Sequence, residues 1–263
     1  RPLLICGGGV VRGRAHEEFK EFAEKLDAPV AITVMGGGGF PGGHPLTTGM
    51  IGMHGSQASN VACNECDLLI AVGCRFSDRV ALQPDTFASQ ARIVHIDIDR
   101  SEIDKNVLTD HHIVGNAKRV LALLNQRLPQ YSHTEWKEHI LPLREPSRPR
   151  DSETLTPKQV LEAIRRLAPQ DTIVATDVGQ HQMWSIQHFH FDYPGQLLTS
   201  GGFGTMGFGL GAAIGAKVGN PDKVVVHTTG DGCFRMNCHE LATVEHYHLP
   251  IITVVFNNGT LGM

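Results

Sequence analysis

The sequence predicts an α/β protein made of two doubly wound parallel-sheet domains, the second of them truncated. Short continuous apolar runs, such as Leu68–Val72, have the composition of strands that are covered on both faces. They alternate with segments whose apolar residues recur at helical spacing, as in residues 15–26. A charged, proline-containing stretch interrupts this alternation near residue 150, and a second set of strands follows it.

Residues 1–145 are predicted to form the first domain. Apolar residues at helical spacing place Phe19, Phe22, Ala23 and Leu26 on one helix face, and Val120, Leu121, Leu124 and Leu128 on another. Strands are expected at residues 3–6, 30–34, 68–72 and 93–98, and helices at residues 15–26 and 117–128. Alternation of this kind favours a parallel sheet with helices on both faces.

Residues 146–155 are predicted to be a linker, and residues 156–263 a second domain. This domain opens on Thr156-Pro157-Lys158-Gln159, which has the N-cap, the proline and the N3 glutamine of a capping box. Strands are expected at residues 173–176, 224–227 and 251–256. The buried face of the opening helix is expected to consist of Val160, Leu161, Ile164 and Leu167.

The composition limits the possible partners. Of the 263 residues, 41% are hydrophobic and 19% are charged, and the formal net charge is −4. This balance gives no electrostatic basis for binding nucleic acid or an anionic membrane surface. No apolar run approaches the roughly 20 residues that cross a bilayer, and the chain starts at Arg1-Pro2 without a signal sequence. We therefore expect a cytoplasmic protein, or an organellar one in a eukaryote, cut from a longer chain.

The chain has six cysteines, and four of them are predicted to be structural. Cys6 and Cys74 lie in apolar runs, where a free cysteine behaves as a small hydrophobic residue. Cys63 and Cys66 form a CxxC, which is compatible with a redox pair or half of a metal site. No second pair stands at zinc-ligand spacing, so the inert interpretation is favoured. The His111-His112 pair likewise lacks further ligands and is expected on the surface.

Two strand ends near the carboxyl terminus carry the most specific chemical signal. The run that begins at Val224 leads into Gly230-Asp231-Gly232, and Ile251–Phe256 leads into Asn257-Asn258. A carboxylate and an amide oxygen, together with a backbone carbonyl, leave octahedral positions open for phosphate oxygens, as Mg²⁺ prefers. Glycine-exposed amides and a helix start near Cys233 favour a diphosphate. Gly-Asp-Gly alone is also common in plain turns, so the pairing with Asn-Asn carries the argument.

The flanking segments resemble acetolactate synthase, a thiamine-diphosphate enzyme. The resemblance lies in residues 177–184, 199–210 and 258–263, with Gly211 where the family usually has proline. It implies that Asp231, Asn258 and the Thr260 carbonyl hold Mg²⁺. It further implies that Met206 is the apolar wedge that bends thiamine, and that the other cofactor-binding residues are Gln180, His181, Gly204, Gly230, Gly232 and Cys233. From the residues alone, core packing is the favoured explanation for Met206, and a surface position is an equally good explanation for His181.

The first domain carries a weaker nucleotide signal. The loop at residues 7–13 follows a strand but has Arg12 at the third glycine position of GxGxxG. Asp97 could accept a ribose hydroxyl or simply cap a loop, and Arg75 and Arg79 could bind a pyrophosphate or be solvated. Residues 49–55, 73–79 and 95–99 resemble the FAD-binding middle domain of the same family, with departures at Ser77 and Asn116. The resemblance implies FAD contacts at Gly8, Gly9, His54, Gly73, Arg75, Asp78, Arg79, Asp97 and Ile98.

The resemblance also implies an activity. The family decarboxylates pyruvate and ligates the two-carbon unit to a second 2-oxo acid in branched-chain amino-acid biosynthesis, as a homodimer or higher oligomer, with a possible regulatory subunit. The activating glutamate of the family belongs to a separate pyrimidine-binding domain, so this chain alone is expected to be inactive. Two alternatives remain open: another thiamine-diphosphate carboligase or decarboxylase, for example one acting on glyoxylate, and a non-catalytic flavin-binding module. Asp231 and Asn258 argue against the flavin module, which needs no Mg²⁺–diphosphate site.

Overall fold

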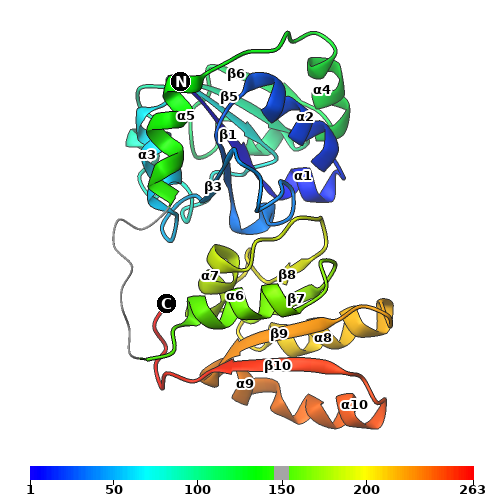
Figure 1. Ribbon diagram of the computed structural model, residues 1–263. Coiled ribbons are helices and arrows are strands. Elements are labelled where there is room, and N and C mark those ends of the chain that lie inside the picture. The colour runs from blue at the N-terminus through cyan, green and yellow to red at the C-terminus, as the bar shows by residue number, and fades with distance from the viewer. Residues whose placement is uncertain (145–153) are drawn as a thin grey trace. The chain divides into compact units, whose positions relative to one another are not determined.

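The computed structural model describes residues 1–144 and 154–263. The chain folds into two compact units, with the change between them near residue 150. The predicted linker at residues 146–155 lies almost entirely outside the described residues. Each unit is an α/β structure whose strand pairs are all parallel (Figure 1). The predicted fold class is therefore confirmed.

The first unit contains a six-stranded sheet in the order β3-β2-β1-β4-β5-β6. Its strands are β1 (Pro2–Cys6), β2 (Val30–Ile32), β3 (Thr47–Met50), β4 (Leu68–Val72), β5 (Arg92–Asp97) and β6 (His111–Val114). Its helices are α1 (Gly8–Arg12), α2 (His16–Leu26), α3 (Gln57–Glu65), α4 (Ala117–Asn125) and α5 (Thr134–Ile140). Short 3₁₀ turns lie at Val34–Gly36, Pro84–Thr86, Arg100–Glu102 and Leu141–Arg144. The strand order reverses between β1 and β4, which makes that junction the switch point of the sheet.

Two hydrophobic layers cover this sheet, one on each face. Phe19 and Phe22 of α2 and Leu121 of α4 are buried in one layer, while Ala62 of α3 and Trp136 of α5 are buried in the other. Figure 1 shows α2 and α4 on one side of the sheet and α3 and α5 on the other. The predicted helix faces are confirmed, since Val120, Leu124 and Leu128 also pack against the layer that contains Leu121.

The second unit contains a four-stranded sheet in the order β10-β9-β7-β8. Its strands are β7 (Ile173–Thr176), β8 (Leu197–Thr199), β9 (Val225–Gly230) and β10 (Ile251–Phe256). Its helices are α6 (Pro157–Leu167), α7 (Gln180–His188), α8 (Phe208–Gly219), α9 (Asp231–Asn237) and α10 (Leu241–His246), with a 3₁₀ turn at Cys238–Glu240. Residues of α8 pack on one face of the sheet, and residues of α6 and the end of α7 pack on the other. The switch point of this sheet lies between β7 and β9.

The opening of the second unit agrees with the sequence in its cap and in Leu161 and Ile164, whereas Val160 is only partly buried. Thr156 and Gln159 form both hydrogen bonds of the capping box at the start of α6. Leu161 is fully buried and Ile164 packs against the core. The predicted burial of Leu167 is wrong, because this last residue of α6 is 81% exposed. The helix ends there, and its final residue no longer faces the sheet.

The cysteines of the CxxC are buried parts of the first unit's core. Cys63 is 4% exposed and Cys66 is fully buried, and both pack in the layer that contains Trp136. Burial raises the pKa of each thiol to about 12, so neither forms a thiolate near neutral pH. The structural interpretation of this pair is confirmed. His111 and His112 are exposed on the edge strand β6, as expected. In the described parts of the chain, no helix combines the length and apolar character of a membrane span.

Candidate cofactor site

The carboxyl edge of the second sheet brings together three chain segments. β7 leads through Asp177 into the start of α7, β9 leads directly into α9, and β10 leads into the loop that contains Asn258. In an open parallel sheet, ligands bind outside the carboxyl ends of the strands at the switch point. The predicted thiamine-diphosphate residues of the first two segments flank that point, because β7 and β9 are hydrogen-bonded neighbours.

Asp177 is the organising residue of this edge. Its side chain is 1% exposed. Oδ2 accepts hydrogen bonds from His227 Nε2 at 3.0 Å and from Thr229 Oγ1 at 2.7 Å, and Oδ1 accepts one from the Gly209 amide at 2.8 Å. Burial alone would raise the pKa of the carboxyl group, but these three donors outweigh burial and lower it. Asp177 is therefore an ionised buried group with every contact supplied by the protein.

His181 carries an unused polar atom at the same edge. The side chain is 4% exposed, and Nε2 is buried without a hydrogen-bond partner. Burial lowers the pKa of the imidazole to about 4, so the ring is neutral at pH 7. The surface position considered for His181 is therefore wrong. Buried polar atoms in proteins normally have partners, so an orphaned Nε2 beside a candidate anion site is consistent with a ligand-binding role.

Two helix starts next to His181 lack side-chain caps. Gly179 is the N-cap of α7 and Gly230 is the N-cap of α9, and neither helix has a side-chain cap hydrogen bond. A Cβ on Gly179 or Gly230 would come within 3 Å of the His181 ring. Glycine is thus needed at both positions for the ring to fit between the two turns. First-turn amides that lack a cap are suited to bind phosphate oxygens.

The predicted magnesium ligands follow adjacent strands. Phe256 pairs with Gly230, so Asp231 and Asn258 both lie just beyond the paired ends of β9 and β10. Asn258 is exposed, and its side-chain amide donates to Gln180 Oε1 at 2.8 Å. Its Oδ1 accepts the Thr260 amide at 3.2 Å. The structure therefore joins Asn258 to the start of α7 and folds the Asn258–Thr260 loop into a tight turn.

Met206 lies beside the diphosphate turn. Its Cε is 3.7 Å from the position that a Cβ on Gly232 would occupy. Met206 is only partly buried and Gly204 is exposed with φ of 67°, so Met206 is not a core residue. Cys233 is buried, and its thiol donates to the Val178 carbonyl at 3.0 Å. The Cys233 side chain is thus structural, and only its backbone is suited to contact a diphosphate.

The glycines of the first unit are explained by close packing of two loops. The Gly9 amide donates to the Gly73 carbonyl at 3.0 Å, and the Gly73 amide donates to the Ile96 carbonyl at 2.8 Å. A Cβ on Gly73, where φ is 60°, would overlap the backbone of Gly9. A Cβ on Gly8 would lie 3.0 Å from the Met35 Cβ. The Gly9 amide already has a partner and is therefore not available to the phosphate that the sequence predicts for this loop.

The remaining predicted flavin residues lie at the carboxyl ends of β3, β4 and β5. Asp97 Oδ1 accepts the Asp99 amide at 2.9 Å, which makes Asp97 a loop cap. Arg79 is within 4.0 Å of Asp78 and donates to Met53 Sδ at 3.6 Å. Side chains that are at least partly exposed at this edge belong to His54, Arg75, Asp78, Arg79 and Ile98. At Asn116, the second departure, the side chain caps α4 by accepting the Arg119 amide at 3.3 Å.

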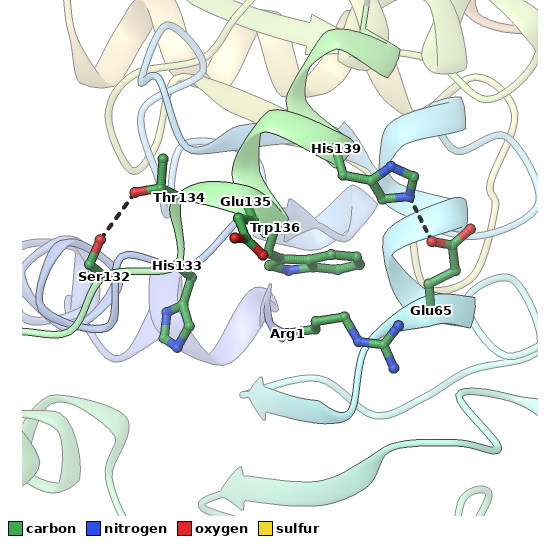
Figure 2. A pocket seen from close by; sticks show the side chains of 8 residues that line it. All are labelled: Arg1, Glu65, Ser132, His133, Thr134, Glu135, Trp136 and His139. Carbon is green, nitrogen blue, oxygen red and sulfur yellow. Dashed lines mark hydrogen bonds and ion pairs between the residues drawn. The ribbon is translucent and has the colours of Figure 1, made fainter.

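A hollow of about 590 Å³ lies elsewhere in the first unit. Figure 2 shows its lining, in which His139 contacts Glu65 at 2.8 Å and Trp136 lies beside Arg1. Arg1 precedes β1 and Glu65 precedes β4, so this hollow lies at the amino ends of the strands. It contains none of the predicted cofactor residues. Its size is therefore no guide to where the predicted cofactors would bind.

Comparison with known families identifies the class of protein. The model of the thiamine pyrophosphate enzyme central domain matches residues 1–124, and the model of the thiamine pyrophosphate enzyme C-terminal TPP binding domain matches residues 177–263. The first match lies within the first structural unit, and the second covers most of the second unit. The chain belongs to the thiamine pyrophosphate enzymes.

Similar individual proteins narrow the class further. The chain is 47% identical to a probable acetolactate synthase large subunit of Methanocaldococcus jannaschii, over all of this chain and 46% of that protein. It is 45% identical to the acetolactate synthase large subunit of Parasynechococcus marenigrum and 42% identical to acetolactate synthase isozyme 2 large subunit of Escherichia coli, over 43% and 48% of those proteins. The chain thus spans about half the length of these relatives and resembles acetolactate synthase large subunits throughout.

Proposed function

We propose that this chain provides the cofactor-binding half of an acetolactate synthase large subunit. The whole protein would decarboxylate pyruvate and join the two-carbon unit to a second 2-oxo acid. The observation that carries the proposal is that His181, Asp231 and Asn258 follow three neighbouring strands at the carboxyl edge of the second sheet, beside two helix starts without side-chain caps. The names of the relatives support the choice of reaction.

The residues present suit a Mg²⁺–diphosphate group. Asp231 offers a carboxylate, Asn258 an amide oxygen and Thr260 a backbone carbonyl, which is a hard-oxygen set with room for phosphate oxygens. The first-turn amides of α7 and α9 and the orphaned Nε2 of His181 would bind the phosphates. Met206, which lies against Gly232, would support the bent thiamine. When bound, thiamine diphosphate supplies the nucleophilic carbon for the reaction.

Calorimetric titration of the protein at its natural length tests this assignment. Thiamine diphosphate is expected to bind only with Mg²⁺, and Asp231→Ala is expected to weaken binding by about tenfold or more. Asp222→Ala is the matched control, because Asp222 is an exposed carboxylate before β9, at the opposite end of that strand. Equal affinity in Asp231→Ala and the control would refute the metal site. Acetolactate formation from pyruvate supports the synthase, whereas turnover of glyoxylate alone would favour the alternative carboligase.

We also propose that the first unit binds FAD at its carboxyl edge. Arg75 and Arg79 follow β4 at the switch point, where a pyrophosphate is expected in a sheet of this order. Because the Gly9 amide and Asp97 have protein partners, the arginines are expected to carry most of the binding. Flavin released on denaturation should be present in the wild type and reduced in Arg75→Ala. The control is Arg92→Ala, since Arg92 is exposed at the amino end of β5.

The cellular setting follows from the same proposal. Six free cysteines, four of them buried in the first unit, are consistent with a reducing compartment such as the cytoplasm. Assembly as a homodimer or higher oligomer and association with a regulatory subunit are expected of the whole protein. Sedimentation of the natural-length protein, alone and with co-purifying proteins, tests both expectations.

A further inference from the structure

Helix α8 begins without a side-chain cap of its own. Its N-cap residue, Gly207, has φ of 84° and no side chain, so the first-turn amides have no local acceptor. The acceptor comes from another element, because Oδ1 of Asp177, one residue beyond β7, accepts the Gly209 amide at 2.8 Å. A carboxylate at a helix start also interacts favourably with the helix dipole. Asp177 therefore caps α8 across the sheet edge.

The other oxygen of Asp177 binds β9. His227 Nε2 and Thr229 Oγ1, both on β9, donate to Oδ2 at 3.0 and 2.7 Å. One carboxylate thus joins the two strands that flank the switch point to the first turn of α8. This turn leaves no spare space, since a Cβ on Gly209 would lie 2.7 Å from His227 Nε2 and from the Asp177 amide nitrogen.

The segment before α8 is held at a second point. Asn237, the last residue of α9, donates from its side chain to the Gly207 carbonyl at 2.5 Å. The loop at residues 200–207, which carries Gly204 and Met206, is therefore fixed at its end by Asp177 on one side and by Asn237 on the other. Met206 in turn lies against Gly232 in the turn proposed to bind the diphosphate.

We propose that Asp177 is a positioning residue for the thiamine site. Its carboxylate fixes the start of α8 relative to β7 and β9, and through that start it sets where Met206 and Gly204 lie relative to the diphosphate turn. All three of its hydrogen bonds are made to the protein, and it is 1% exposed, so it acts through its neighbours. The role of the loop in cofactor binding rests on the proposed function, whereas the hydrogen bonds that anchor the loop are present in the chain itself.

Hydrogen–deuterium exchange of the cofactor-free protein tests the anchoring directly. Asp177→Asn and Gly209→Ala are each expected to speed amide exchange in residues 200–210 by about tenfold, since both weaken the link between Asp177 and α8. Lys217→Met is the matched control. Lys217 is 7% exposed and donates to the Pro221 and Lys223 carbonyls at the far end of the same helix. That variant should speed exchange only near its own end of α8.

Unchanged exchange of residues 200–210 in both variants, or an equal increase in Lys217→Met, would overturn the inference. If Asp177→Asn does not fold, Gly209→Ala carries the test, because it keeps the carboxylate and the side chains of its β9 donors and changes only the space between them and α8.

Ligand binding then distinguishes a positioning role of Asp177 from general damage to the fold. In the natural-length protein with Mg²⁺, Asp177→Asn should weaken thiamine diphosphate binding about tenfold and inorganic pyrophosphate binding less than about threefold, because only the former uses the 200–207 loop. Equal weakening for both ligands would contradict the inference. Wild-type protein that binds neither ligand would refute the proposed function, and the exchange data alone would then decide whether Asp177 fixes the loop.

Discussion

Acidification is expected to destabilise the second unit through His181. The folded protein holds the pKa of this imidazole at about 4, chiefly by burial, whereas the unfolded chain has the ordinary value of 6.5. Between these values the unfolded state binds a proton that the folded state does not, so stability falls as the pH falls. Above pH 6.5 the neutral ring leaves the stability of the second unit at its full value, and this stability is lost progressively as the pH falls to about 4.

The size of the effect follows from the interval between the two pKa values. One pH unit corresponds to 1.36 kcal/mol of differential interaction, so the interval of about 2.5 units corresponds to about 3 kcal/mol. That is a large share of the 5–15 kcal/mol by which domains are usually stable. The largest slope, about 1.4 kcal/mol per pH unit, is expected between pH 5 and 6.

Urea unfolding of cofactor-free protein between pH 4.5 and 7.5 measures this slope. Trp184 lies one turn after His181 on α7 and contacts Phe256 with ring centroids 5.8 Å apart, so in a Trp136→Phe background its fluorescence reports on the second unit. His181→Phe should flatten the dependence of unfolding free energy on pH, whereas the exposed-site control His111→Gln should keep it. A His181→Phe protein with the wild-type slope would refute this reasoning.

Two further predictions concern other parts of the molecule. In the native protein, Cys238 is expected to react with a thiol reagent long before the other five cysteines, because it alone among them is exposed; rapid labelling of Cys63 or Cys66 would contradict the burial of the pair. Thr156→Ala should lower the unfolding free energy of the second unit by about 1 kcal/mol, because it removes the hydroxyl that accepts the Gln159 amide. Thr156→Ser should restore most of that loss, and denaturant midpoints for the two variants would show whether the cap acts as described.

Much of the fold could be predicted because its signals are local. The runs at Leu68–Val72, Ile173–Thr176 and Ile251–Phe256 are strands with the expected bounds, since continuous apolar character and length identify a doubly covered strand. The placement of Asp231 and Asn258 was predictable for the same reason. Each follows a recognisable strand, and the parallel pairing of those strands brings their ends together.

The short strands carried no such signal. β3, β6 and β8 have three or four residues each, and β6 is exposed throughout, so no apolar run marks it. β5 ends at Asp97, and the predicted extension to Ile98 is wrong because Ile98 is 69% exposed beyond the strand. The strand predicted at residues 30–34 also ends early, at Ile32. A 3₁₀ turn begins two residues later, at Val34.

The organisation of the site was hidden because it depends on distant residues. Asp177 follows an apolar run as Asp231 does, and that position was the only local hint of its importance. Its partners Gly209 and His227 are 32 and 50 residues away in the sequence. The burial of His181 could not be predicted either, since its ring fits between two turns only because Gly179 and Gly230 have no Cβ. Spacing within one segment does not encode such contacts.

The two units differ in the chemistry of their central strands. β1 and β4 of the first unit are apolar throughout, whereas β9 carries the buried residues His227, Thr228 and Thr229 next to Asp177. Burying a carboxylate costs several kcal/mol, and three hydrogen bonds to a charged group return about 1.5–3 kcal/mol each. The two contributions nearly cancel, so fold stability alone does not explain the cluster. Its distinct effect is geometric, because β7 and β9 are already paired and the carboxylate adds directional bonds that fix the start of α8 to both strands, at the point where the strand order reverses.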